Sequence, residues 1–455
     1  MNKKYNMILT IAAITILGST LLGSTYTQTQ LDTQSLDLSK MDVDVLQQIH
    51  DMGGLQLVMP KAFSETDCDA LENSGRNVVN FDLTGESVKL PIMGHTAEDP
   101  KEYYGMAFNQ QVPGPTLRVQ QGDVVVMTLT IPDDESTGHG NDMHASQTSA
   151  VNFDSVNPGE STQFCYIAQS AGVFKYHCSG VHLVGMDQHV LSGMYGIAIV
   201  DPVNGYKKLM VEKTTPAGDI DRIFYDSDAL EFQLQYSQHY LTENGLYDSV
   251  AMMKHQNTGS VVNGLQFGYV PNEGHNELIN GDKNKNIFVA QPWNAADLAQ
   301  YQSQPLFVET GKPVRFFVEN QGNEPVYWHV VGEIIDRVTQ GNRVQSGATE
   351  TWLLGGSQNM IADIVFDEPG VYVAVNHDYA AIFSGAATVI VAGDPFGLNE
   401  KLNVDPPVAS YAYLLGNPSD SIPPMGAQSV KHPMINLHGL YTDERAAQIK
   451  AELGI

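Results

Sequence analysis

A histidine and a cysteine stand side by side, and two further potential metal ligands follow at short intervals. The pair is His177-Cys178, and His189 and Met194 lie eleven and sixteen residues after the cysteine. A cysteine thiolate, a histidine and a weakly bound axial methionine on one loop, with a second histidine from elsewhere, form the trigonal set that selects copper for electron transfer. The spacing therefore predicts a blue-copper (type 1) site.

The histidine beside the cysteine predicts a second metal. Adjacent residues on an extended strand point to opposite faces. We therefore expect His177 to face away from the copper held by Cys178 and to be free to bind another ion. The two metals would then be joined by a covalent path only one residue long.

An upstream segment, His139-Gly140-Asn141-Asp142-Met143-His144, supplies a ligand to each site. Its two histidines are five residues apart, an odd separation, so on a strand they also face opposite ways. His139 is predicted to complete the type 1 set and His144 to join His177. Asp142 shares the face of His144, and a carboxylate beside a metal is placed to hold or move a proton.

The second metal needs a third histidine, and the second half of the chain offers two. His377 is the candidate ligand, and His329 would form an acid/base pair with Asp142 over the metal, since histidine titrates near neutrality. Val331 would form an apolar wall on the same face. The alternative is that His144 and His377 are hydrogen-bonded core residues, that Asp142 caps a turn and that His329 only occupies the end of a strand.

Strands must position these residues. Short Val/Ile/Phe/Thr-rich runs, punctuated by Gly, Pro and Asn, fill the chain from about Val78 to Val391 and predict β-sandwiches. The clearest runs are Thr116–Val119, Asp123–Ile131, Gly196–Val200, Val314–Val318 and Ala386–Val391.

The two halves of the chain resemble each other, which predicts two related sandwiches in tandem. The first half contains, in order, Leu117–Val124, His139, Gly172–Phe174 and His177. The second contains Leu306–Val314, His329, Gly370–Tyr372 and His377. The predicted organisation is a signal peptide (1–25), an N-terminal extension (26–75), a first domain (76–203), a linker (204–220), a second domain (221–394) and an irregular C-terminal tail (395–455).

Composition limits the partners. The 455 residues carry a formal net charge of -28, which argues against nucleic acid or anionic lipid as a partner. Two lysines precede an apolar stretch from Met7 to Leu22, as in a signal peptide, which predicts export; a retained membrane anchor is the competing interpretation. Of the three cysteines, Cys68 and Cys165 could pair in an oxidising compartment or lie buried as small apolar residues.

From about Val78 to Val391 the chain resembles the copper-containing nitrite reductases, a branch of the two-domain cupredoxin proteins. Besides the ligand pattern, the motifs that carry the resemblance are Phe108–Thr116, Val156–Glu160, Ser192–Gly196, Glu350–Leu353 and Pro369–Tyr372. The resemblance implies an all-β fold of two Greek-key cupredoxin sandwiches and two coppers per chain.

The resemblance also implies a role for each site residue. Type 1 copper would be bound by His139, Cys178, His189 and Met194. Type 2 copper would be bound by His144, His177 and, from the adjacent subunit of a homotrimer, His377. Asp142 and His329 would be the catalytic pair.

The chain departs from the family pattern in two places, one that bears on docking of the electron donor and one that bears on the route of proton supply. The loop Ser179–Gln188 is longer than in common members and contains the additional His182 and Met186. Ile334 occupies a place where many members have a further histidine of the proton channel.

The predicted activity is one-electron reduction of nitrite to nitric oxide and water, with a small cupredoxin or cytochrome as donor, on the periplasmic, pseudoperiplasmic or extracellular side of the membrane. The alternatives are an oxidase of the same architecture, acting for example on hydroxylamine, and a non-catalytic copper electron-transfer protein. The sequence argues against a trinuclear oxygen-reducing cluster, as in a laccase-type oxidase, because the chain has no His-x-His motif and Ser179 follows Cys178. The net charge of -28 should on average repel nitrite unless cations gather near the site.

Overall fold

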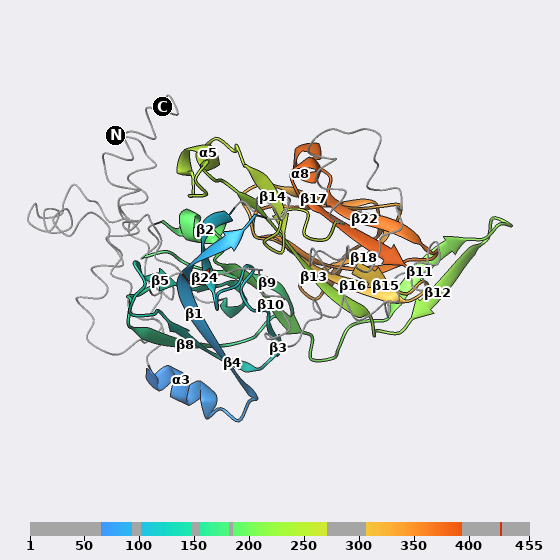
Figure 1. Cartoon of the computed structure of the whole chain (residues 1–455). Helices are drawn as coiled ribbons and strands as arrows, with labels where there is room; N and C mark the ends of the chain where they lie inside the picture. Colours follow the sequence, from blue (N-terminus) through green and yellow to red (C-terminus); the bar gives the residue numbers. More distant parts are fainter. Residues whose placement is uncertain are drawn as a thin grey trace, which may run out of the picture. The chain divides into compact units, whose positions relative to one another are not determined.

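The computed structural model describes residues 65–92, 102–147, 155–181, 185–270, 306–393 and 428–429. The predicted signal segment, most of the N-terminal extension and His182 lie outside the described residues. So does the C-terminal tail apart from Gln428–Ser429. Within the described ranges the chain is mainly β-structure, as predicted (Figure 1).

The first sandwich consists of two sheets. One contains, in spatial order, β2 (Glu102–Phe108), β1 (Val78–Pro91), β4 (Val124–Thr130) and β8 (Ser161–Ile167). The other contains β3 (Leu117–Gln120), β10 (Tyr195–Asp201), β9 (Gly172–His177) and β6 (Asp142–Met143). The short strands β5 (His139–Gly140) and β7 (Ser155–Val156) pair separately.

The second sandwich repeats this plan with longer sheets. One contains β14 (Gly259–Val262), β13 (Leu230–His239), β16 (Pro313–Asn320), β21 (Asn359–Val365), β18 (Ile335–Gln340) and β19 (Arg343–Thr349). The other contains β15 (Leu306–Val308), β23 (Ala387–Ala392), β22 (Gly370–Asn376), β17 (Val326–Val331) and β20 (Thr351–Leu354).

The internal repeat of the sequence corresponds to a repeat in strand order. In the first sandwich β10 pairs parallel with β3 and antiparallel with β9, which pairs antiparallel with β6. In the second, β23 pairs parallel with β15 and antiparallel with β22, which pairs antiparallel with β17. His177 ends β9 and His377 follows β22, so both lie at the same end of equivalent strands.

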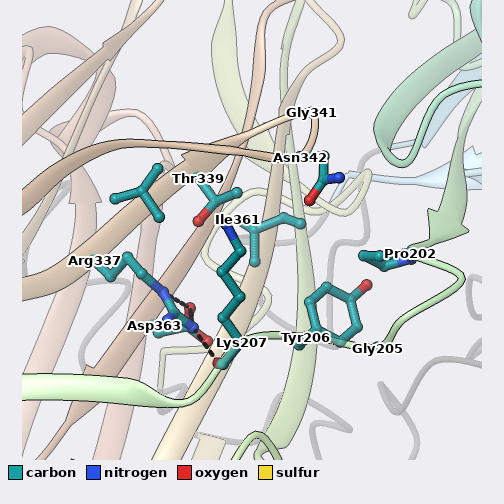
Figure 2. A pocket seen from close by; sticks show the side chains of 11 residues that line it. Pro202, Gly205, Tyr206, Lys207, Arg337, Thr339, Gly341, Asn342, Ile361 and Asp363 are labelled. Atoms are coloured by element: carbon teal, nitrogen blue, oxygen red, sulfur yellow. Dashed lines mark hydrogen bonds and ion pairs between the residues drawn. The ribbon is translucent and has the colours of Figure 1, made fainter.

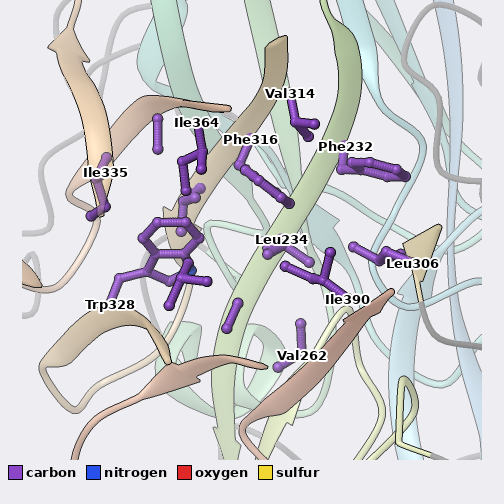
Figure 3. Close-up of a cluster of buried hydrophobic side chains, with 14 of the residues drawn as sticks. Phe232, Leu234, Val262, Leu306, Val314, Phe316, Trp328, Ile335, Ile364 and Ile390 are labelled. Carbon is purple, nitrogen blue, oxygen red and sulfur yellow. The ribbon is translucent and has the colours of Figure 1, made fainter. Parts of the chain in front are cut away.

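The five strand segments predicted from composition are all strands, with ends displaced by one or two residues. Their alternating side chains form a separate core in each sandwich. Figure 3 shows part of the larger core, where Trp328, Phe316 and Ile390 are fully buried. Burial of about 150–250 Å² per aromatic side chain makes such residues the main contributors to core stability.

A third apolar cluster joins the two sandwiches. Val173 of β9 and Ile197 and Ile199 of β10 pack against Phe317 and Ile361 of the second sandwich. These side chains are all almost completely buried. The outer face of the β9–β10 pair is therefore an interface and not a solvated surface.

Charged residues extend the same interface. Arg118 forms ion pairs with Asp201 and with Glu231 of the second sandwich, both at 2.7 Å. Glu231 also accepts a hydrogen bond from Arg315, which pairs with Asp363 at 2.9 Å. Each of these carboxylates is therefore paired with an arginine, and none is buried without a compensating positive charge.

A pocket lies between the segment after β10 and the second sandwich (Figure 2). It is lined by Tyr206 and Lys207 from that segment and by Arg337, Ile361 and Asp363 from the second sandwich. Arg337 is already bound to Asp363 at 2.7 Å and to the carbonyl oxygens of residues 207 and 208. None of the predicted metal or catalytic residues lines this pocket.

Connections outside the sheets include a hairpin, short helices and a disulfide. Strands β11 (Leu209–Thr214) and β12 (Ile220–Tyr225) form the hairpin, and the longest described helix is α3 (Glu65–Glu72). Cys68 of α3 and Cys165 of β8 form a disulfide, which decides between the two interpretations of these cysteines. In the tail, β24 (Gln428–Ser429) pairs with β1. No helix among the described ranges is long and apolar enough to cross a membrane.

Candidate metal centres

Strand β9 directs alternate side chains to two environments. Tyr176, and Cys178 just after the strand, lie in the core of the first sandwich. Val173 and Lys175 lie on the opposite face, where they meet the second sandwich. His177 shares that face, as the two-residue period of a strand requires.

The first cluster of donor atoms contains the cysteine and two histidines. Cys178 Sγ lies 3.2 Å from His189 Nδ1 and 3.8 Å from His139 Nδ1, and the two nitrogens are 3.0 Å apart. Bonds of about 2.0–2.3 Å to a shared metal, at about 120° in a plane, would separate such donors by about 3.5–3.8 Å. A trigonal copper(S,N,N) centre fits these residues with small movements.

Met194 is packed into the same core as Cys178. It is fully buried, and its carbonyl oxygen accepts a hydrogen bond from the Cys178 N–H at 3.0 Å. A Cβ added at Gly85 would lie 2.8 Å from the methyl carbon of Met194 and 3.3 Å from Cβ of His139. Gly85 of β1 therefore leaves the space that both side chains occupy, a role the sequence pattern alone did not reveal.

Helix α4 (Met186–Leu191) carries His189 to the cluster. The predicted long loop after Cys178 thus ends in one and a half helical turns, and His189 is fully buried on its inner side. Asp187, on the same helix, accepts a hydrogen bond from Tyr247 of the second sandwich at 2.7 Å. This contact helps to fix the helix, and hence the ligand, against the second sandwich.

The sulfur of Cys178 has its own hydrogen-bond donors. The backbone N–H groups of Gly180 and Gly140 lie 3.2 and 3.5 Å from Sγ. Burial raises the pKa of the Cys178 thiol to about 12, although these two N–H groups lower it. A thiolate at this position therefore requires a bound cation, as metal-ligand cysteines do.

A second cluster contains Asp142, His144 and His177. The two histidine Nε2 atoms are 3.3 Å apart, and Asp142 Oδ2 lies 3.6 Å from His144 Nε2 and 3.4 Å from His177 Nε2. Two imidazole nitrogens at this separation can bind one copper ion, and the carboxylate lies beside them. Across the described part of the chain, three or more His, Cys, Asp or Glu donors converge only in these two clusters.

His177 is held in the tautomer that metal binding needs. Its Nδ1 lies 2.9 Å from the carbonyl oxygen of Cys178, and because a carbonyl only accepts, Nδ1–H is the donor. The Nε2 lone pair then faces His144. Burial, with the nearby Lys175 and His144 charges, lowers the pKa of His177 to about 3, although Asp142 and the Cys178 carbonyl raise it. The ring is thus neutral at neutral pH.

The segment from His139 to His144 differs from the predicted single strand. It forms β5, β6 and then a short 3-10 helix, His144–Ser146. His139 still points to the first cluster and His144 to the second, but the breaks in the strand, and not strand parity alone, produce this separation. Asp142 remains beside His144, as expected.

His329 and His377 lie together on the second sandwich, outside both clusters. Their ring centroids are 5.1 Å apart, and Glu350 O accepts a hydrogen bond from His329 Nδ1 at 2.9 Å. His377 is exposed. Within one chain the structure does not join these two histidines to Asp142, His144 or His177.

An exposed apolar face surrounds these two histidines. Tyr327, His329 and Val331 point outward from β17, so Val331 does share the face of His329. Leu353, opposite Tyr327 on β20, is 52% exposed, and Tyr379 is 69% exposed. An exposed patch of this kind is typical of a protein interaction surface.

Comparison with known proteins agrees with the fold. The family model described as multicopper oxidase matches residues 93–205. A copper-containing nitrite reductase of Rhizobium sullae is 30% identical over 333 residues, covering 70% of this chain and 77% of that protein. One of Rhizobium meliloti (strain 1021) is 29% identical over 328 residues, with the same coverage. The solved copper nitrite reductase from Nitrosomonas europaea superposes with a TM-score of 0.55 at 28% identity, covering 70% of this chain and 95% of that structure.

Two tandem sandwiches of this topology, with a buried Cys-His-His set at the end of one strand, define a two-domain cupredoxin protein of the multicopper oxidase class. Within that class, the chain belongs to the copper-containing nitrite reductases.

Proposed function

We propose that this enzyme reduces nitrite to nitric oxide and water. The reaction consumes one electron and two protons for each nitrite, which balances both atoms and charge. The observation that carries the proposal is the meeting of two donor clusters at adjacent residues. His177 belongs to one and Cys178 to the other. Copper, when bound at both, would supply one-electron redox chemistry, with a docked donor on one side and the substrate on the other.

The cluster of Cys178 is proposed as the type 1 site. His139, Cys178 and His189 would be its equatorial ligands, and Met194 its axial ligand. The buried sulfur and its two N–H donors support this role, since hydrogen bonds to the cysteine tune the potential of blue-copper centres. A small cupredoxin or cytochrome is the proposed electron donor.

The cluster of His177 is proposed as the type 2 site, completed by a second copy of the chain. His144 and His177 supply two ligands, and His377 of another copy would supply the third. The apolar face around His377 supports this arrangement, because burying that face against a neighbour would bring the histidine to a cluster that lacks a third nitrogen. A homotrimer closes the arrangement with identical interfaces.

Asp142 and His329 are proposed to deliver the protons. Asp142 lies beside the two Nε2 atoms without being needed as a ligand, so its carboxyl can hold a proton against a substrate oxygen. His329, next to His377, would arrive at the same site from the neighbouring copy. Each would donate one proton as the N–O bond breaks and water forms.

Export is proposed for the mature enzyme. The Cys68–Cys165 disulfide supports it, because such bonds persist in oxidising compartments outside the cytosol. The apolar N-terminal stretch supports it from the sequence.

The proposed activity is tested by reducing the copper-loaded protein in a stopped-flow instrument and adding nitrite or, separately, hydroxylamine. We expect nitrite to reoxidise the blue centre with one nitric oxide released per electron. Reoxidation without nitric oxide, or reduction of the oxidised protein by hydroxylamine with no response to nitrite, would contradict the proposal.

A further inference from the structure

A lysine lies buried between the two sandwiches, two residues before a ligand of the proposed type 2 site. Lys175 of β9 is only 5% exposed, and its Nζ donates a 2.8 Å hydrogen bond to the carbonyl oxygen of Gln321. The fully buried carboxyl of Glu319, on β16, interacts electrostatically with the same ammonium. The second sandwich thus holds a cation that belongs to the first.

The position of Lys175 relates it to the metal ligands. It lies two residues before His177 and on the same face of the strand, a separation of about 6.6 Å along the chain. Its charge acts on His177 and on Asp142, the ligand and the carboxyl of the second cluster.

Other cations at this interface are balanced more fully. Arg118 binds the carboxylates of Asp201 and Glu231, and Arg315 binds those of Glu231 and Asp363. Lys175 has no carboxylate within ion-pair distance among the described residues and is two residues from His177 on the same strand.

The negative charge of the chain makes a buried cation near the site important for binding an anion. The chain carries a net charge of -28, which opposes the approach of an anion. Surface charges are screened within about 8 Å at physiological salt, whereas a buried charge is screened much less. A single buried ammonium next to the site can therefore outweigh many exposed carboxylates there.

Resting on the proposed function, we propose that Lys175 is a positioning residue of the second metal site. Its ammonium attracts the anionic substrate to the metal held by His144 and His177, and raises the reduction potential of that metal. The Gln321 carbonyl holds the ammonium in place through its hydrogen bond, and the buried carboxyl of Glu319 acts on it electrostatically. Lys175 acts through the field and does not touch the substrate.

The decisive variant is the double substitution Lys175→Met with Glu319→Gln. It removes one cation and one anion, so the net charge is unchanged and no buried carboxylate loses its partner. Azide serves as the anion probe, titrated spectroscopically into the oxidised, copper-loaded protein. We expect its dissociation constant to rise about threefold, because the ammonium is carried by the strand of His177 and its counter-charge by β16, so their opposing effects at the metal cancel only in part. Redox titration should show the sharing of an electron between the two coppers shifted about threefold towards the blue centre, which is about 28 mV at about 59 mV per tenfold.

Two single variants complete the test. Glu319→Gln leaves the ammonium without its counter-charge, so azide should bind at least as tightly as in the wild type. Lys208→Met removes an exposed cation far more accessible to solvent than Lys175, and should alter neither the azide affinity nor the potential. Steady-state kinetics of the double variant should show a raised KM for nitrite.

A double variant that folds, binds two coppers and retains wild-type azide affinity and potential overturns the proposal. Weaker azide binding in Glu319→Gln also contradicts it. If the double variant differs from the wild type only in a lower melting temperature, Lys175 and Glu319 only stabilise the interface between the sandwiches, and the proposal is wrong. These measurements need no turnover, so absence of nitrite reduction by the wild type would remove the proposed function without deciding the role of Lys175.

Discussion

The Nδ1–H of His177 donates a 2.9 Å hydrogen bond to the carbonyl oxygen of Cys178, although the two side chains belong to different donor clusters. The peptide and this hydrogen bond give two routes between the clusters. The bond also fixes the tautomer of His177, so that its Nε2 faces His144. One local contact thus orients a ligand and connects the two proposed coppers.

Replacing Cys178 by Ala should remove copper from the first site and leave it in the second. Without the thiolate the first cluster cannot form a blue centre, so the intense visible absorption should disappear. His144 and His177 are unaltered, and copper analysis with electron paramagnetic resonance should still find the second site filled. Loss of both coppers on this change would mean that the clusters are not independent.

Asp142→Asn tests the proposed proton transfer. The amide keeps the shape of the side chain but cannot hold a transferable proton, so nitrite turnover should fall about 100-fold or more. The blue absorption should be unchanged, because Asp142 belongs to the other cluster. Wild-type nitric oxide release from this variant would remove Asp142 from the mechanism.

Mixing two inactive variants tests whether the second site is shared between copies. His144→Ala and His377→Ala each remove one proposed ligand, so each alone should lose activity. If the site is formed by two copies, coexpression should restore part of the activity. Some interfaces would then combine the intact His144 of one variant with the intact His377 of the other. If all ligands came from one chain, no mixture could recover activity.

Gly85→Ala should disturb the proposed type 1 site from a distance in sequence. The added Cβ would lie 2.8 Å from side-chain carbons of Ile131 and Met194. Overpacking of this kind destabilises a fold by about 1–3 kcal/mol, and displacement of Met194 should shift the visible spectrum. Gly347→Ala, whose new Cβ would meet its nearest atom at 3.5 Å, is the matched control and should leave the spectrum as it is.

The copper-free protein should become less stable in acid through His239. Burial lowers the pKa of this histidine to about 4. Its unfolded form, with a pKa of about 6.5, binds more protons in between, so stability is complete above about pH 6.5 and falls as the pH drops towards 4, by up to about 3 kcal/mol. His239→Gln should reduce this dependence in thermal melts at several pH values, leaving the part due to His177, whose pKa is also lowered by burial. The exposed His255→Gln should not, and an equal effect of both changes would exclude burial as the cause.

Much of the candidate site could be predicted from the sequence. The spacing of Cys178, His189 and Met194 specified a donor set, and the two-residue period of a strand separated His177 from Cys178. The repeated strand pattern predicted two sandwiches, and the structure has them. These inferences succeed because they depend on local geometry, which sequence separation alone determines.

The remaining features depend on contacts between distant residues. Strand parity could not reveal that the His139–His144 segment breaks into β5, β6 and a 3-10 turn, because packing against the core decides where a strand bends. Nor could it show that Gly85 makes room for Met194 and His139. Both are consequences of side-chain volume in a filled interior.

Sequence by itself determined which donor types are present, their order, and the division of His177 and Cys178 between two faces. Only the tertiary structure decided that His329 and His377 lie apart from the second cluster, and that the carbonyl of Gln321 in the second sandwich binds the Lys175 ammonium. The physical reason is that burial and the field at a site are set by every chain segment that packs there, whereas periodicity reports only the direction in which each side chain leaves its own strand.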